Sequence, residues 1–238
     1  MTGRRLFRVL VLAAALAVTA SLVYGLSNVR RGYAPRQPVA FNHKRMAGAP
    51  VMQPNERGET VNVGGFGIPC VYCHTMAYKS RHATIPSTAV CMNCHTSVGL
   101  NREWVLRMKD YWDRGQPIPW VKVHDLPDFV YFDHSAHLNA KDAQGRLKLA
   151  AVDAAGNPTV PCRTCHGDVA AMEIVSVQNN FNMQWCLDCH RNPAPNLRPV
   201  EFVTKLDWQP QGDPAAYGRQ LIEAKGIKPP QNCSGCHR

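Results

Sequence analysis

Cys162-Arg163-Thr164-Cys165-His166 is one of five copies of the pattern Cys-x-x-Cys-His in this chain of 238 residues. The other copies begin at Cys70, Cys91, Cys186 and Cys233, so together they use all ten cysteines. A disulfide framework does not need a His after every second Cys, and neither does a zinc site built from four thiolates. A thioredoxin-like motif would occur once, beside a βαβ pattern that the sequence lacks. The repetition therefore predicts five sites of one chemical kind.

Cys-x-x-Cys-His is the attachment signature of c-type haem, in which both sulfurs bond to the porphyrin edge and the His ligates the iron. The sequence thus predicts five c-type haems, each with its iron, as the cofactors. The covalent attachment residues are Cys70, Cys73, Cys91, Cys94, Cys162, Cys165, Cys186, Cys189, Cys233 and Cys236. The proximal iron ligands are His74, His95, His166, His190 and His237.

Five histidines remain once the motifs have used theirs. A low-spin electron-transfer haem needs a second axial ligand, so five haems need five more side chains. The equality of the two numbers predicts bis-histidine ligation at every iron. Because two protein ligands close the iron to substrate, we expect electron transfer and no catalytic residue. The candidate distal ligands are His43, His82, His124, His134 and His137.

An internal repeat organises the chain. The hexapeptide FNHKRM at 41–46 precedes the motifs at Cys70 and Cys91, with 27 residues from its His to Cys70 and 21 more to Cys91. The hexapeptide FDHSAH at 132–137 precedes the motifs at Cys162 and Cys186 with the corresponding intervals of 28 and 24. The repeat predicts one haem domain over 31–238, with di-haem modules at 41–100 and 132–192 and a fifth haem at 233–237.

The element Phe-x-His-x-x-His is similar to the one that supplies distal ligands in the small multihaem cytochromes of the c3 and c7 type. In those proteins the first His ligates the next haem in the chain and the second His reaches a different haem. The resemblance therefore implies that His43 serves the haem at Cys70 and that His134 serves the haem at Cys162. It leaves the other three distal candidates unassigned.

The first copy of this element departs from the pattern, because Met46 stands where the second His belongs. A thioether can ligate haem iron and raises its potential. The alternative distal ligands, against an ordinary packing role for each, are Met46, Met172 and Met183.

The N-terminus predicts a membrane anchor at residues 1–30. Arg4, Arg5 and Arg8 precede a run from Val9 to Val29 that carries no charge, and 21 residues in a helix can cross a hydrocarbon core of about 30 Å. By the positive-inside rule the arginines stay in the cytoplasm and the haem domain lies on the periplasmic side of a bacterial membrane. The competing interpretation is a signal peptide that is cleaved before Ser21.

The predicted fold class is a multihaem cytochrome c, with short helices and irregular loops around five covalent haems and little or no sheet. Gly and Pro make 35 of the residues, which interrupts regular structure often. Helical spacing predicts longer helices over 101–115, with Asn101 as cap, and over 214–225, with Asp213 as cap. The segments 47–66 and 192–213 are predicted to be irregular. With about 42 residues per haem, the porphyrins must form much of the core.

The stretch PWVKVHDLPDFVYFDHSAH at 119–137, with the N-terminal segment and the five motifs, resembles the pentahaem cytochrome subunit of bacterial alternative complex III. Ile85-Pro86-Ser87 belongs to the same resemblance, which covers nearly the whole chain. Membrane subunits of that complex oxidise quinol and pass electrons through an iron–sulfur subunit and the cytochrome to a periplasmic carrier, such as a cytochrome c, or to a terminal oxidase. The resemblance implies an electron-transfer subunit with these partners.

Other functions stay open at this point. Related quinone reductase complexes use a similar cytochrome with electrons flowing in the opposite direction. A free-standing membrane-anchored quinol dehydrogenase also carries an anchor and several haems. A multihaem reductase such as pentahaem nitrite reductase usually has Lys in its catalytic motif, and no Cys-x-x-Cys-Lys occurs here. The formal charge of +10 is offset by haem propionates, and no basic patch with interleaved aromatic residues indicates nucleic-acid binding.

Overall fold

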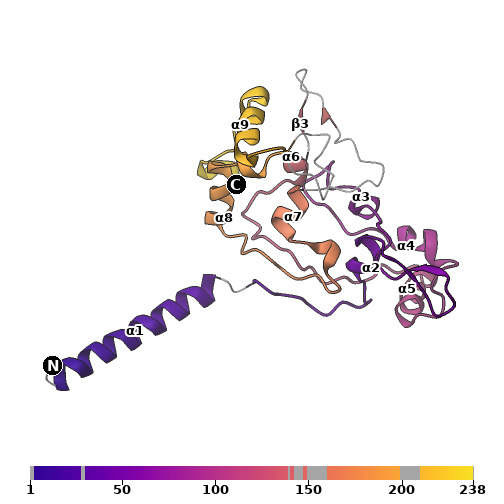
Figure 1. Cartoon of the computed structure of the whole chain (residues 1–238), viewed down its shortest axis with the longest axis horizontal. Coiled ribbons are helices and arrows are strands. Elements are labelled where there is room, and N and C mark those ends of the chain that lie inside the picture. Colours follow the sequence, from indigo (N-terminus) through magenta and orange to yellow (C-terminus); the bar gives the residue numbers. More distant parts are fainter. Residues whose placement is uncertain are drawn as a thin grey trace.

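The computed structural model describes residues 3–27, 30–138, 140–141, 147–148, 160–198 and 210–237. One long helix, α1 (Gly3–Ser27), extends away from the rest of the chain (Figure 1). The described residues of 30–237, called the body below, form short helices joined by long loops with little sheet. This architecture agrees with the predicted fold class in its helices, loops and scarcity of sheet.

Helix α1 is long and apolar enough to cross a membrane. Its span Gly3–Leu26 has a mean hydropathy of 2.3, and its side chains are all exposed. The helix includes Arg4, Arg5 and Arg8, so it begins before the uncharged run that starts at Val9. Its 25 residues extend about 37 Å, more than the ~30 Å of a hydrocarbon core. A membrane anchor and a signal sequence both fit such a helix near the N-terminus.

The body contains many short helices. Those that carry Cys-x-x-Cys-His motifs have at most nine residues, and the longest in the body, α5 and α9, have 11 and 12. The body helices are α2 (His43–Ala47), α3 (Cys70–Cys73), α4 (Thr88–His95), α5 (Glu103–Asp113), α6 (His134–Leu138), α7 (Val160–His166), η1 (Val169–Ala171), α8 (Met183–Arg191), η2 (Ala194–Asn196), α9 (Pro214–Lys225) and α10 (Cys233–Cys236).

The two longer helices test the sequence-based boundaries. Helix α9 is confirmed: Asp213 accepts hydrogen bonds from the N–H groups of Ala215 and Ala216, both at 3.0 Å, and Gly226 follows the helix with φ of +59°. Helix α5 begins later than predicted, because Arg102 and not Asn101 is its N-cap residue, and no side chain caps it.

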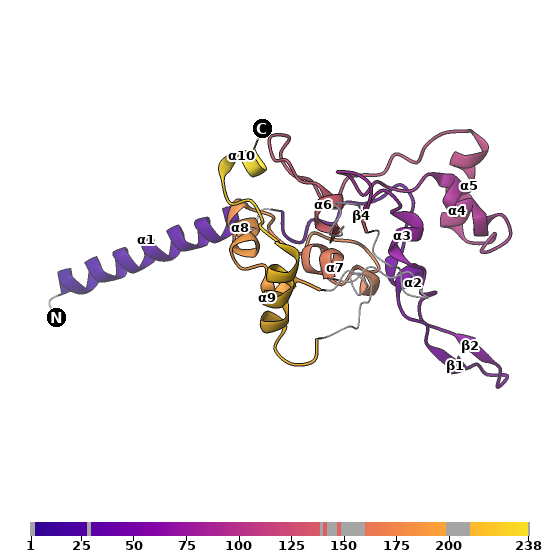
Figure 2. The ribbon, with the colours of Figure 1, turned by 90° about the horizontal axis from the view of Figure 1, so that it is seen from above.

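A small hairpin corrects the prediction that 47–66 is irregular. Strands β1 (Met52–Pro54) and β2 (Thr60–Asn62) pair in antiparallel register, with Met52 opposite Asn62 (Figure 2). The Asn55 side chain stabilises the turn by accepting from the N–H groups of Arg57 and Glu59. Two-residue strands β3 (Ala140–Lys141) and β4 (Leu147–Lys148) also pair. The predicted irregular segment 192–213 contains η2, and its residues 199–209 lie outside the described chain.

The peptide core of the body is small. One buried cluster joins α4 to α5, and a second lies beside α3 and α6. Val105 of α5 is fully buried, whereas many of the larger apolar side chains of the body stay exposed. The first cluster consists of Val39, Met92, Val105, Met108 and Ile118, and the second of Ala77, Tyr78 and Leu138. These clusters leave most of the motif helices without a peptide core of their own.

Replacing Gly218 by Ala is expected to lower the stability of the protein, although the same change stabilises most helices. Gly218 lies buried inside α9, and a Cβ at this position would stand 1.9 Å from the carbonyl oxygen of Ala194 in η2. On an isolated helix Gly→Ala stabilises by about 0.5–1 kcal/mol, but here Gly218→Ala is expected to destabilise the holoprotein by about 1–3 kcal/mol because α9 must move off η2. Thermal unfolding checks this. Gln220→Ala, an exposed change on the same helix, is the control and should stay within about 0.5 kcal/mol.

Candidate haem-attachment sites

Each of the five motifs lies on a short helix, with its His inside the helix or directly after it. One helical turn brings the two cysteines, three residues apart, onto one face. Asn182 caps α8 by accepting from the Trp185 N–H at 2.8 Å, and Asn232 caps α10 by accepting from the Gly235 N–H at 3.1 Å. The sequence analysis missed these two caps, although Asn directly before the first residue of a helix is a recognised N-cap signal. These caps fix where α8 and α10 begin. In each of these two helices both sulfurs of the motif then lie on one face.

All ten cysteines are free of disulfides. Burial raises the pKa of Cys162 and of Cys165 to about 12, so these sulfurs favour an uncharged form. Within the described chain, no group of three or more His, Cys, Asp or Glu side chains is arranged to hold a metal ion. Uncharged sulfur in a thioether link to porphyrin fits this environment.

Three of the five motif histidines have a fixed ring orientation. The Nδ1 atoms of His74, His95 and His190 lie 2.6, 2.9 and 2.6 Å from backbone carbonyl oxygens of Thr84, Val98 and Pro230. A carbonyl oxygen can only accept, so Nδ1 carries the proton and Nε2 keeps its lone pair. Hydrogen bonding of one ring nitrogen in this way orients a histidine whose other nitrogen ligates a metal.

Two of the distal candidates have the same arrangement. His134 Nδ1 donates to the Arg81 carbonyl at 2.8 Å, and His137 Nδ1 donates to the Asp133 carbonyl at 2.8 Å. Both histidines lie on α6, three residues apart. Their Nε2 atoms therefore also keep the lone pair that iron ligation needs.

These two histidines face two motif histidines. The ring centroids of His134 and His166 are 6.3 Å apart with planes inclined by 4°, and those of His137 and His190 are 6.2 Å apart with planes inclined by 29°. A metal–imidazole bond is about 2 Å long and the ring centroid lies about 1 Å further, so two imidazoles on opposite sides of one metal have centroids about 6 Å apart. Both pairs fit an iron between them.

The remaining distal candidates differ in their surroundings. Burial and the nearby His74 lower the pKa of His43 to about 4. Burial also lowers the pKa of His124, and its Nε2 is buried with no hydrogen-bond partner among the described residues. The His124 ring lies 4.3 Å from the ring of His166, which is too close for opposite ligands of one iron. His82 is exposed.

Two motif histidines lie against other aromatic rings. Burial, followed by nearby histidines, lowers the pKa of His166 to about 3, which keeps its ring neutral and able to bind a metal. His237 stacks on Phe129 with ring centroids 5.9 Å apart.

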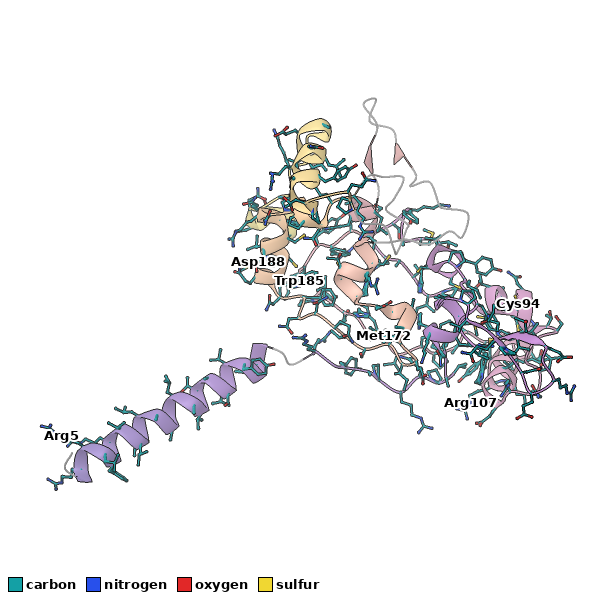
Figure 3. The ribbon with its side chains drawn as sticks, viewed as in Figure 1. Arg5, Cys94, Arg107, Met172, Trp185 and Asp188 are labelled. Carbon is teal, nitrogen blue, oxygen red and sulfur yellow. The ribbon has the colours of Figure 1, made fainter. Side chains whose placement is uncertain are left out.

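The three methionine alternatives lie in different places. Met46 and Met172 are half-buried, and Met183 at the start of α8 is 67% exposed. Met172 lies near the centre of the body (Figure 3), with its methyl group close to Gly167, the residue after His166. Their role as iron ligands stays a prediction.

The carbonyl groups that bond to the histidines are functional features that sequence reasoning did not identify. A backbone oxygen has no side-chain signature, so only the fold brings Thr84 or Pro230 to a histidine. Thr84 adopts φ of +61°, a conformation that β-branched residues rarely adopt. This backbone geometry presents the Thr84 carbonyl to His74.

Comparison with known proteins finds a relative that is a multihaem cytochrome c. No family model matches this chain. The multihaem cytochrome c subunit of menaquinone reductase from Nitratidesulfovibrio vulgaris (strain Hildenborough) is 31% identical over 168 residues, which cover 66% of this chain and 68% of that subunit.

Proposed function

Because the chain belongs to the family of multihaem cytochromes c that includes this menaquinone reductase subunit, we propose that it is the electron-relay subunit of a quinone-linked membrane complex. Its ten motif cysteines bind five haems covalently, and its ten histidines supply the axial ligands. The haem domain of 31–238, with its two di-haem modules and a terminal haem, lies on the periplasmic side. Helix α1 anchors it in the cytoplasmic membrane.

The observation that carries this proposal is the spacing of two histidine pairs, which suits an iron held between two imidazole rings. The ring centroids of His134 and His166 are 6.3 Å apart, and those of His137 and His190 are 6.2 Å apart. Backbone carbonyls hold the Nδ1 atoms of His134, His137 and His190. A bound haem supplies one-electron chemistry by cycling its iron between ferric and ferrous states. With a histidine held on each side of every haem iron, the chain would leave no iron open to substrate and would have no catalytic site of its own.

Two directions of electron flow have support from different observations. The stretch 119–137 resembles alternative complex III, which favours oxidation of quinol with electrons passing through an iron–sulfur subunit and this cytochrome to a periplasmic carrier or an oxidase. The relative is a subunit of a menaquinone reductase, which favours the opposite direction. A free-standing quinol dehydrogenase and a multihaem reductase are the competing classes.

The haem content gives the first test. We expect the alkaline pyridine haemochrome assay to find five haems per polypeptide in the purified full-length protein, and electron paramagnetic resonance of the oxidised protein to show low-spin signals. Replacing Cys233 and Cys236 by Ser is expected to reduce the count to four. A count below five in the unaltered protein, or a high-spin ferric signal from it, contradicts the proposal and favours a reductase.

Purification from native membranes separates the other classes. We expect iron–sulfur and multispanning membrane subunits to elute with the chain, and quinol added to that complex to reduce its haems. Haems that are instead oxidised by added quinone, after reduction by a periplasmic donor, assign the reductase direction. Quinol oxidation by the isolated chain would favour a free-standing dehydrogenase.

A further inference from the structure

The five motif helices do not follow one another in space in the order of the chain. Figures 1 and 2 show α4 at one end of the body, followed by α3, α7 and α8, and Figure 2 shows α10 beside α8 at the other end. Figure 3 shows the same separation, since Cys94 of α4 and Asp188 of α8 lie at opposite ends. The contacts between neighbouring motifs agree with this order.

The motif on α4 contacts the motif on α3. Asn93, inside the second motif, donates from Nδ2 to the phenol oxygen of Tyr72, inside the first, at 3.1 Å. The two sites of the first module are therefore direct neighbours.

The motif on α3 is joined to the motif on α7 through helix α6. Tyr78 is buried in a cluster with Leu138 of α6, and Val71 of the motif on α3 packs against that cluster. Helix α6 also brings His134 to His166 of the motif on α7, with ring centroids 6.3 Å apart. The connection between the two modules thus passes through the first motif of each.

The last three motifs follow in chain order. Asn179, ahead of α8, donates to the carbonyl of Cys165 in α7 at 2.7 Å. Helix α6 lies between these motifs, because its two histidines face His166 and His190. His190 donates to the carbonyl of Pro230 just before α10 at 2.6 Å, and Gln231 donates to the carbonyl of His190 at 3.4 Å.

We propose that the haem sites form one line in the order Cys91, Cys70, Cys162, Cys186, Cys233, with the first two inverted relative to the chain. The inference rests on the proposed function, since it takes each motif to carry a haem. All ten cysteines are described, and of these Cys94 and Cys233 are exposed while the other eight are half-buried. The two exposed cysteines belong to the two ends of the line. External donors and acceptors therefore meet the line at α4 and α10.

Each step along the line moves one electron and changes no covalent bond. With haems bound, each transfer would oxidise one site by one electron and reduce its neighbour by one, and no bond of the protein would form or break. In the inverted order, an electron at the Cys91 site reaches the Cys162 site through the Cys70 site. In chain order it would travel from the Cys70 site through the Cys91 site.

The variants His95→Met and His74→Met separate the two orders in the full-length holoprotein. A Met in place of an axial His raises the potential of its haem, so the altered site takes the first electron of a reductive titration. The added charge lowers the potentials of the nearest haems most, because the interaction falls with distance. Potentiometry followed by electron paramagnetic resonance is expected to show one other haem shifted by His95→Met and two by His74→Met. His237→Met, at the other end, is the control and should shift one.

The reverse pattern, with two haems shifted by His95→Met and one by His74→Met, would overturn the proposed order. It would leave the proposed function standing provided that five haems are counted, whereas a lower haem count removes the proposed function itself. If a variant loses haem, iron positions from anomalous X-ray diffraction of the unaltered holoprotein decide the question. Iron of the Cys70 site next to that of the Cys162 site supports the order, and iron of the Cys91 site in that position refutes it.

Discussion

Without covalent haem attachment, the body is expected to lose its cooperative melting transition. Its described residues bury few hydrophobic side chains, in two small clusters and at isolated positions. Its helices are at most 12 residues long, a length at which isolated helices are marginal in water. Losing the haems removes the links between the motif helices. The expected loss is the whole free energy of unfolding, on the order of 5–15 kcal/mol.

Circular dichroism on a thermal ramp measures this effect. The test protein has Ser at all ten cysteine positions, and the control is the holoprotein of the unaltered chain from the same host. The control is expected to melt with a sigmoidal transition, and the Ser variant to show weak helicity that declines gradually. A sigmoidal transition in the Ser variant would mean that the peptide core folds without the cofactors.

Local signals predicted the parts of the fold that depend on neighbouring residues. Asp213 and Gly226 bound α9 because a cap and a left-handed residue act over one turn. The β1–β2 hairpin escaped prediction because its turn depends on the side chain of Asn55 and not on alternating hydrophobic residues. Long-range contacts had no local signal at all: the Tyr131 N–H donates to the Cys236 carbonyl at 2.6 Å across more than a hundred residues.

In the candidate site too, the sequence predicts the local features and leaves the long-range ones open. The motifs state which residues can bind haem, because attachment needs two sulfurs and a histidine within five consecutive positions. The pairing of histidines depends on the path of the chain, and the sequence supplied it only through a resemblance. That resemblance pairs His134 with the haem of His166, and the two rings lie at a spacing that fits such a pair. The assignment stays a prediction, as do those of the other distal ligands.

His134→Ala is expected to remove one axial ligand from one of the five haem irons. The variant removes the ring that faces His166 at 6.3 Å, and the neighbouring His124, at 4.3 Å, is too close to His166 to replace it. The oxidised protein should then show one high-spin haem per chain, and the reduced protein should bind about one equivalent of carbon monoxide, against almost none before the change. Added imidazole should restore the low-spin spectrum, which a merely structural defect would not allow.

Two further variants decide whether His134 or His124 is the ligand at this iron. Ser135→Ala removes a neighbouring hydroxyl that donates to Asp133 at 2.7 Å and should leave every haem low-spin. His124→Ala is expected to open a different iron, because a ring 4.3 Å from His166 cannot share that metal with it from the opposite side. The double variant should therefore bind about two equivalents of carbon monoxide. One equivalent in the double variant would mean that both histidines serve the same iron, and an unchanged low-spin spectrum in His134→Ala would remove His134 from the ligand set.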